Sequence, residues 1–140
     1  ADFIFGSVKK HWGILHGYKP HKIKYSWGFY SSHSTGFFIK RKVAEKIGFY
    51  NIKYKYHADY DYFYRLIVKN KMKGISTKKN EIVGVFRRGG FSSKISFWKK
   101  LKEDIRIRYD NGQNIFLLIL IFSNKFLRNI DQILKNIINK

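Results

Sequence analysis

Positive charge is so abundant in this chain that it limits how compactly the chain can fold on its own. The 140 residues include 29 Lys and Arg but only 9 Asp and Glu, which gives a formal net charge of +20. Such an excess repels itself unless an anionic partner lies nearby. Nucleic acid, an anionic membrane surface and phosphorylated small molecules all meet that need. An AT-rich genome, which encodes many Lys, Ile, Asn, Phe and Tyr residues, is a competing explanation for part of the excess.

The apolar content predicts a folded domain in spite of this charge. Hydrophobic residues make up 44% of the chain and aromatic residues 19%, and this length suits one modest core. The chain has no cysteine, which excludes a disulfide scaffold and a thiolate metal site. The longest apolar run, residues 115–122, is far shorter than the roughly 20 residues that span a bilayer. Because the chain opens on a strand-like segment, we expect it to be the later part of a longer protein.

The first half predicts short elements separated by a long loop. Residues 2–5 and 34–39 predict strands, and residues 40–47 predict a helix that ends at Gly48, a common cap residue. Residues 9–32 show no steady period and predict a loop with little regular structure, which a compact domain rarely keeps without a use for it. The aromatic residues of this loop that can stack on a sugar ring or a base are Trp12, Tyr18, Tyr25, Trp27 and Tyr30.

The second half predicts three helices and a strand pair. Residues 58–70 have helical spacing, residues 74–77 and 82–86 predict strands that pair around residues 78–80, and residues 96–109 predict a second helix. The apolar stripe of the first helix is Tyr62, Phe63, Leu66 and Ile67. In the second helix, Asp104 and Arg108 are spaced as an exposed ion pair. Asn111-Gly112 breaks that helix, and a last amphipathic, basic helix begins near residue 114.

Two carboxylates stand at the start of the helix over residues 58–70. Asp59 lies in its first turn, three and four residues before Tyr62 and Phe63, so we expect it to point toward the buried face. Asp61 is four residues before Arg65 and can pair with it. An inward carboxylate is costly unless it has a role, which makes Asp59 a candidate for chemistry. The alternative is that both aspartates only cap the helix.

Four segments in order resemble the latter half of the catalytic domain of family 2 glycosyltransferases, which have a GT-A fold. They are Ser34-Thr35-Gly36-Phe37-Phe38-Ile39, Lys46-Ile47-Gly48-Phe49-Tyr50, Ala58-Asp59-Tyr60-Asp61 with Arg65, and Arg88-Gly89-Gly90-Phe91-Ser92. The resemblance implies that residues 1–95 form the acceptor-side part of an α/β GT-A domain and that residues 96–140 are a helical extension. It also implies that the donor-binding half, with its metal motif for Mg²⁺ or Mn²⁺, is not in this chain.

The resemblance implies an inverting transfer from a nucleotide-diphosphate sugar to a glycan or lipid-linked acceptor. Asp59 takes the role of catalytic base, and Asp61 and Arg65 support it. The remaining candidates for substrate binding are His33, Ser34, Thr35, Arg87, Arg88, Gly89 and Gly90. The two arginines suit the leaving diphosphate, although a solvated basic turn explains them as well. His57 is a weak candidate for a metal ligand, because the five histidines show no ligand spacing.

Two alternative hypotheses for the function, neither of which involves catalysis, remain open. A basic module that binds nucleic acid fits the charge and the aromatic residues, but no zinc spacing or helix-turn-helix signature accompanies them. A module that binds an anionic membrane fits the apolar run and the basic helix that follows it, and this property is also compatible with a transferase. The alternative for that last helix is packing on the domain's own core. We expect a transferase that builds cell-surface polysaccharide in the cytoplasm or on the cytoplasmic face of a membrane.

Overall fold

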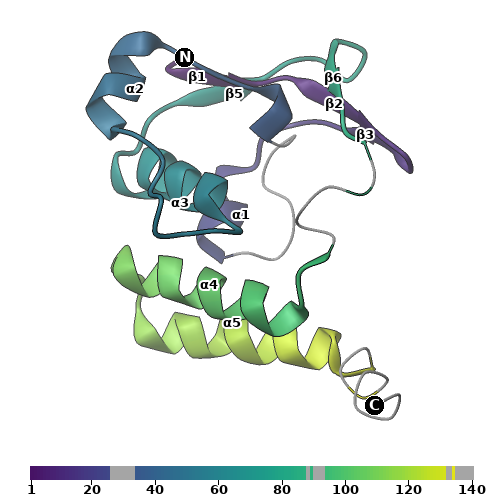
Figure 1. Cartoon of the computed structure of the whole chain (residues 1–140). Coiled ribbons are helices and arrows are strands. Elements are labelled where there is room, and N and C mark those ends of the chain that lie inside the picture. The colour runs from purple at the N-terminus through teal and green to yellow at the C-terminus, as the bar shows by residue number, and fades with distance from the viewer. Residues whose placement is uncertain (26–33, 88, 90–93, 132–133, 135–140) are drawn as a thin grey trace.

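A computed structural model describes residues 1–25, 34–87, 89, 94–131 and 134 of the chain. Its elements form three layers, with two small sheets at the top of Figure 1, helices in the middle and a helix pair at the bottom. The middle layer holds α1 (Pro20–Tyr25) and α3 (Ala58–Phe63), and the bottom layer holds α4 (Phe97–Asp110) and α5 (Ile115–Arg128). The helix α2 (Arg41–Ile47) lies at one end of the sheets. The expected mixed α/β class is therefore confirmed.

The two sheets share one continuous segment as their middle strands. In order across each sheet, the strands are β4 (Phe37–Ile39), β1 (Phe3–Phe5) and β5 (Gly74–Ser76), and then β3 (Gly13–Leu15), β2 (Ser7–Lys10) and β6 (Ile82–Val85). Only Gly6 separates β1 from β2. A side chain there would collide with Val83, since a Cβ on Gly6 would lie 2.3 Å from Val83 Cγ2. Both β5 and β6 run parallel to this segment, while β4 and β3 run antiparallel to it.

The prediction that residues 74–77 pair with residues 82–86 is wrong. The strand β5 pairs with β1, and β6 pairs with β2. Ser7, at the start of β2, is fully buried against the segment that joins β5 to β6. Its N–H donates to Thr77 Oγ1 at 3.0 Å, and its hydroxyl donates to the Lys78 carbonyl at 2.9 Å. The strands β5 and β6 therefore pair with the continuous β1–β2 segment and not with each other.

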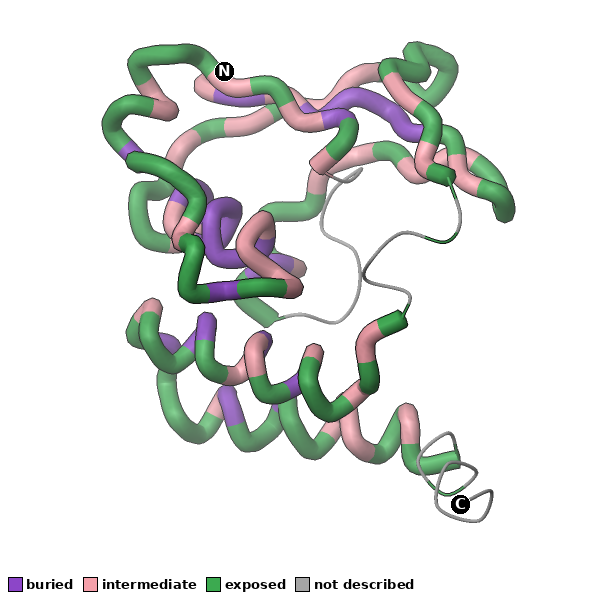
Figure 2. The backbone as a smooth tube through the Cα atoms, viewed as in Figure 1, coloured by how far each residue is buried: buried purple, intermediate pink, exposed green. Residues whose placement is uncertain are grey.

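Aromatic rings fill the space between the first sheet and the middle layer. Phe5 lies 5.3 Å from Phe63 of α3 and 5.2 Å from Phe37, and Phe3 lies 5.4 Å from Tyr18, measured between ring centroids. Such pairs add about 0.5–1.5 kcal/mol beyond the burial of their area. Figure 2 shows the buried segments of β1 and α3 facing each other. Tyr18 thus packs, partly buried, against this core, and burial raises its pKa to about 12.

The expected loop over residues 9–32 is partly wrong. Its described part contains the end of β2, the strand β3 and the helix α1. These elements are three to six residues long, too short for a period to show in the sequence. Trp12 stands 59% exposed at the turn between β2 and β3, and Tyr25 ends α1 in a half-exposed position. Trp27 and Tyr30 lie outside the described residues.

The helices of the first half agree with expectation, with two refinements. The helix over residues 58–70 is confirmed and its predicted stripe is buried, but its second half widens into a π-helix, η2 (Tyr64–Lys69). The expected strand over residues 34–39 is a 3₁₀ turn, η1 (Ser34–Gly36), followed by β4. The helix α2 ends at Gly48 as predicted, with a positive φ of 82°.

The bottom layer is joined to the core through buried polar groups of α4. Asp104 and Arg108 pair as predicted, but they are buried and not exposed. Arg108 has no exposed surface because α1 and α3 cover it. Its guanidinium donates to the Lys24 carbonyl at 2.8 Å and lies 4.9 Å from the Tyr60 ring. Ile107 of the same helix belongs to the main core cluster.

A tight turn reverses the chain between the two helices of the bottom layer. The predicted break at Asn111-Gly112 is confirmed, with φ of 77° at Gly112. Asn114 caps α5, because its side chain accepts the N–H of Phe116 at 2.9 Å. None of the helices in the described part of the chain is both long and apolar enough to cross a membrane. The division after residue 95 stays a prediction.

Candidate functional site

The two carboxylates at the start of α3 have different surroundings. Asp61 is 2% exposed, whereas Asp59 is only half-buried. The expectation that Asp59 is the inward carboxylate is therefore wrong. Asp61 takes that position because the end of α4 covers it, where Asn111 Nδ2 donates to Asp61 Oδ1 at 2.8 Å. Asp59 Oδ1 accepts only the neighbouring backbone N–H of Tyr60, at 2.8 Å, among the contacts of the described residues.

Arg65 connects the start of α3 to the end of α2. Its Nε donates to Asp61 Oδ2 at 2.9 Å, as the four-residue spacing predicts. Its two terminal nitrogens donate to the carbonyls of Ile47 at 2.7 Å and Phe49 at 2.8 Å. A planar guanidinium suits this arrangement, since its donors point along fixed directions. One side chain thereby holds residues 46–50 and residues 58–61 against each other.

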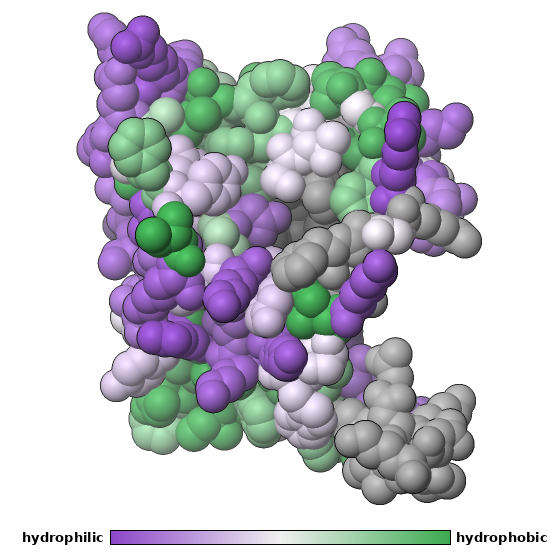
Figure 3. Space-filling model, viewed as in Figure 1, coloured by the Kyte–Doolittle hydropathy of each residue, from purple (hydrophilic) through white to green (hydrophobic). Residues whose placement is uncertain are grey.

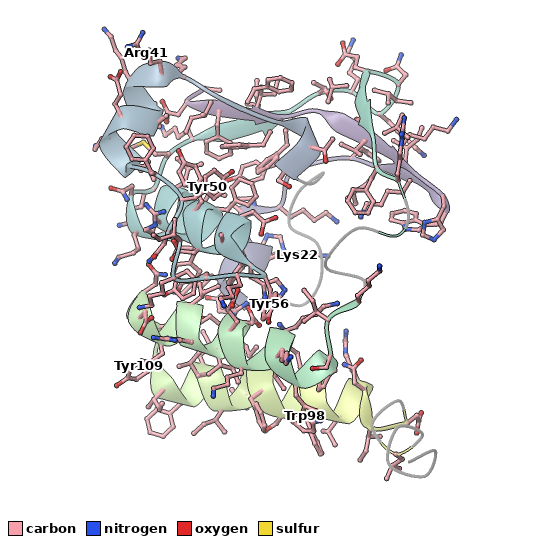
Figure 4. All side chains as sticks on the ribbon, viewed as in Figure 1. Lys22, Arg41, Tyr50, Tyr56, Trp98 and Tyr109 are labelled. Atoms are coloured by element: carbon pink, nitrogen blue, oxygen red, sulfur yellow. The ribbon has the colours of Figure 1, made fainter. Side chains whose placement is uncertain are left out.

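The phenol of Tyr50 is close enough to Asp59 for the two groups to interact electrostatically. Tyr50 stacks on Tyr62, with ring centroids 4.7 Å apart. Burial raises the pKa of Tyr50, and the negative charge of Asp59 raises it further. The phenol therefore keeps its proton at neutral pH and can donate a hydrogen bond. Figure 4 shows Tyr50 beside α3 and Tyr56 between α3 and α4.

The segment that leads into α3 is held from below by Glu103 of α4. Its Oε1 accepts the N–H groups of Tyr56 at 2.6 Å and His57 at 2.8 Å, and its Oε2 accepts that of Lys55 at 3.0 Å. Three amides directed at one carboxylate form charge-assisted hydrogen bonds, which are stronger than neutral ones. The position of Asp59 thus depends on α4, which lies in a different layer.

His57 lies half-buried beside these groups. Burial lowers its pKa, while the nearby carboxylates of Asp104, Asp59 and Glu103 oppose that effect and Lys125 adds to it. Its Nδ1 is buried without a hydrogen-bond partner in the described structure. Within the described ranges, no three His, Asp or Glu side chains gather as metal ligands would. The structure therefore gives His57 no companion ligands.

The 3₁₀ turn η1 places two further candidate residues next to the sheets. A Cβ on Gly36 would lie 2.6 Å from the Gly6 carbonyl oxygen, so this turn approaches the β1–β2 junction closely. Thr35 packs closely against β6, because a Cβ on Gly84 of that strand would lie 3.0 Å from Thr35 Cγ2. Arg87 follows β6 and is exposed, and Gly89 has a positive φ of 84°. His33, Arg88 and Gly90 lie outside the described residues.

Sequence reasoning missed three residues that shape this region. Glu103 carried no signal, because its partners are backbone amides about 46 residues earlier in the chain. The sequence indicates Asn111 only as a helix breaker, and Tyr50 only as part of a segment.

The candidate site therefore consists of a partly exposed carboxylate, Asp59, which lies near a protonated phenol on a helix that is held from two sides. Such a carboxylate can accept a proton from a hydroxyl group within hydrogen-bond reach.

Comparisons of this chain with models of protein families, with curated proteins and with solved structures found no match.

Proposed function

We propose that this chain is the acceptor-side part of an inverting glycosyltransferase with a GT-A fold, in which Asp59 is the catalytic base. The observation that carries the proposal is the bonding of Arg65. Its contacts with Asp61 and with the carbonyls of Ile47 and Phe49 give a physical reason why the segments around residues 46–50 and 58–61 occur together. Phe37 adds the segment of residues 34–39, since its ring lies 4.8 Å from Phe63 of the same helix.

The environments of the two carboxylates support different roles for them. Asp61 already accepts hydrogen bonds from Arg65 and Asn111, so it supports the helix. Asp59 is the more accessible of the two groups. In the proposed reaction, the acceptor oxygen attacks the anomeric carbon of the donor sugar, its proton passes to Asp59, and the bond to the nucleotide diphosphate breaks. Asp59 is therefore the better placed of the two to act as the base.

The remaining candidates would bind the two substrates of this reaction. Arg87, with Arg88, Gly89 and Gly90 after it, would meet the leaving diphosphate, and Ser34, Thr35 and His33 would contact the substrates. Cationic donors near a leaving diphosphate lower the barrier to transfer. A divalent metal belongs to the donor-binding half in this proposal. The described residues contain no group of three His, Asp or Glu side chains that could hold this metal.

Activity of the longer protein tests this function. In a protein that includes the donor-binding half, we expect Asp59→Asn to lower kcat by about 10²–10⁴-fold, with little change in the KM for the donor. Lys42→Gln, on the exposed surface of α2, serves as the control. Full activity of the Asp59→Asn protein would refute the role of this residue. The 140 residues alone should transfer no sugar. Turnover of a nucleotide sugar by these residues would contradict the proposal that they form only the acceptor-side part of the enzyme.

A further inference from the structure

The helix α5 carries a broad apolar surface that no described element covers. One side of the helix packs on α4 through Leu118 and Ile121, which are buried. Much of another side of the helix is apolar and exposed to solvent. We call this surface the α5 face, and it consists of Ile115, Phe116, Ile119, Leu120 and Leu127, each between 51% and 73% exposed. Exposed apolar surfaces of this kind mark sites of interaction.

Aromatic side chains of α4 border the α5 face. A cavity of about 220 Å³ runs between the two helices, lined by Trp98, Leu101, Lys102, Ile105 and Phe122. Trp98 is 51% exposed and its ring lies 6.0 Å from that of Phe126, while Tyr109 stands open to solvent farther along α4. Figure 4 shows both aromatic residues on the bottom layer. Trp and Tyr are the residues that gather at the boundary between hydrocarbon and water.

Cations follow directly beyond this aromatic border. Lys99, Lys102 and Arg106 are spaced three and four residues apart on one exposed side of α4. They line a second cavity of about 220 Å³, together with Glu103 of the same helix and with Lys53, Tyr54 and Tyr56. Lys102 lines both cavities, so the basic row is continuous with the apolar cavity between α4 and α5. Figure 3 shows hydrophilic side chains in a band above the hydrophobic surface of the bottom layer.

We propose that this surface docks on an anionic lipid bilayer. The α5 face would enter the acyl boundary, Trp98 and Tyr109 would lie at the interface, and the row of Lys99, Lys102 and Arg106 would meet the headgroups. Charge favours this partner, because the chain carries +20 and has no acidic residue from 111 to 130. A second copy of the chain would bring like charges together, and a nucleic acid would leave the apolar face uncovered. The inference does not depend on sugar transfer.

Sedimentation with lipid vesicles tests the docking surface on the 140-residue chain. We expect binding to vesicles of phosphatidylcholine mixed with phosphatidylglycerol, and much weaker binding to phosphatidylcholine alone. Added salt should weaken the binding, because it screens the headgroup charges. Equal binding to both kinds of vesicle, or no binding to the anionic ones, would overturn the proposal.

Two sets of variants separate the apolar and the charged parts of this surface. Phe116→Ser with Leu120→Ser should weaken binding by about tenfold for each side chain. The matched control is Phe49→Ser with Ile52→Ser, since these residues are 95% and 96% exposed but lie outside the bottom layer. Lys102→Gln and Arg106→Gln should each cost about fivefold on anionic vesicles only, against Lys42→Gln as control.

All of these substitutions are at exposed positions, so circular dichroism should show an unchanged fold. If the control pairs weaken binding as much as the test pairs, the binding is unspecific and the proposed surface is wrong. If Phe116→Ser with Leu120→Ser instead dissolves a dimer and leaves vesicle binding unchanged, the α5 face is an interface between copies of the chain.

Discussion

Asp59 and Asp61 show how two neighbouring residues of the same type acquire different properties. The four-residue spacing predicts the pair of Asp61 with Arg65, because both partners lie on one helix. Which carboxylate is buried depends on Asn111, which is 50 residues away in the chain. Sequence periodicity carries no information about such a distant cover. The sequence therefore indicates that a carboxylate is buried here but identifies the wrong one.

Replacing Asp61 should destabilise the fold far more than replacing Asp59. Asp61→Asn leaves Arg65 without its anionic partner in a largely buried position, and breaking a buried pair in this way costs about 3 kcal/mol. Asp59→Asn should change the free energy of unfolding by less than about 0.5 kcal/mol. Urea denaturation of the two variants measures both effects. Equal losses would mean that Asp59 is also a structural residue.

The lowered pKa of the half-buried His57 imidazole should make the stability depend on pH. Its pKa in the folded state lies below the ordinary value of 6.5, so the unfolded chain takes up a proton more readily than the folded one. The stabilisation is complete above pH 6.5 and is lost as the pH falls below that value. We expect His57→Gln to flatten this part of the profile of unfolding free energy against pH. His11→Gln, on the exposed turn before β3, serves as the control substitution.

At the scale of elements, a helix or strand can be predicted from the sequence only when it is long enough for its apolar pattern to repeat. The helices α3 and α4 were predicted within one or two residues of their starts, because their apolar spacing repeats over several turns. The strands β2 and β3 have four and three residues, which is too few for alternation to appear, and the whole hairpin was missed. The parallel pairing of β5 with β1 was missed as well, since adjacent strands along a chain usually pair with each other.

Glu103 should control the order of the segment between α2 and α3. Glu103→Ala removes three hydrogen bonds to backbone amides, so we expect faster hydrogen exchange at residues 55–57 and a loss of about 2 kcal/mol in stability. Glu45→Ala removes an exposed ion pair with Arg41 and should change stability by less than about 0.5 kcal/mol. Unchanged exchange at residues 55–57 would show that other contacts hold the segment.

At the scale of the whole molecule, charge opposes compactness. The net charge of +20 is read directly from the sequence, and the few ion pairs on the surface remove little of the repulsion. The three layers could not be predicted in the same way. Their order depends on contacts such as that of Arg108 with Lys24, residues that lie 84 positions apart.

Salt should therefore stabilise this fold. Raising the sodium chloride concentration shortens the Debye length to about 8 Å near 0.15 M, which screens repulsion between distant lysines. We expect the midpoint of thermal unfolding to rise with salt, and Lys79→Glu, on the exposed turn before β6, to reduce this dependence. A midpoint that falls with salt would mean that ion pairs outweigh the repulsion.

The two attachments of α3 have a consequence for whatever molecule meets Asp59. Arg65 joins the helix to α2, and Glu103 joins the preceding segment to α4, so its first turn is held from opposite sides before any ligand arrives. Ordering a loop or a side chain on binding costs conformational entropy, about 0.5–1.5 kcal/mol for each flexible side chain. Here that ordering is completed during folding. A ligand at Asp59 would therefore lose its own freedom on binding, while the protein would lose little.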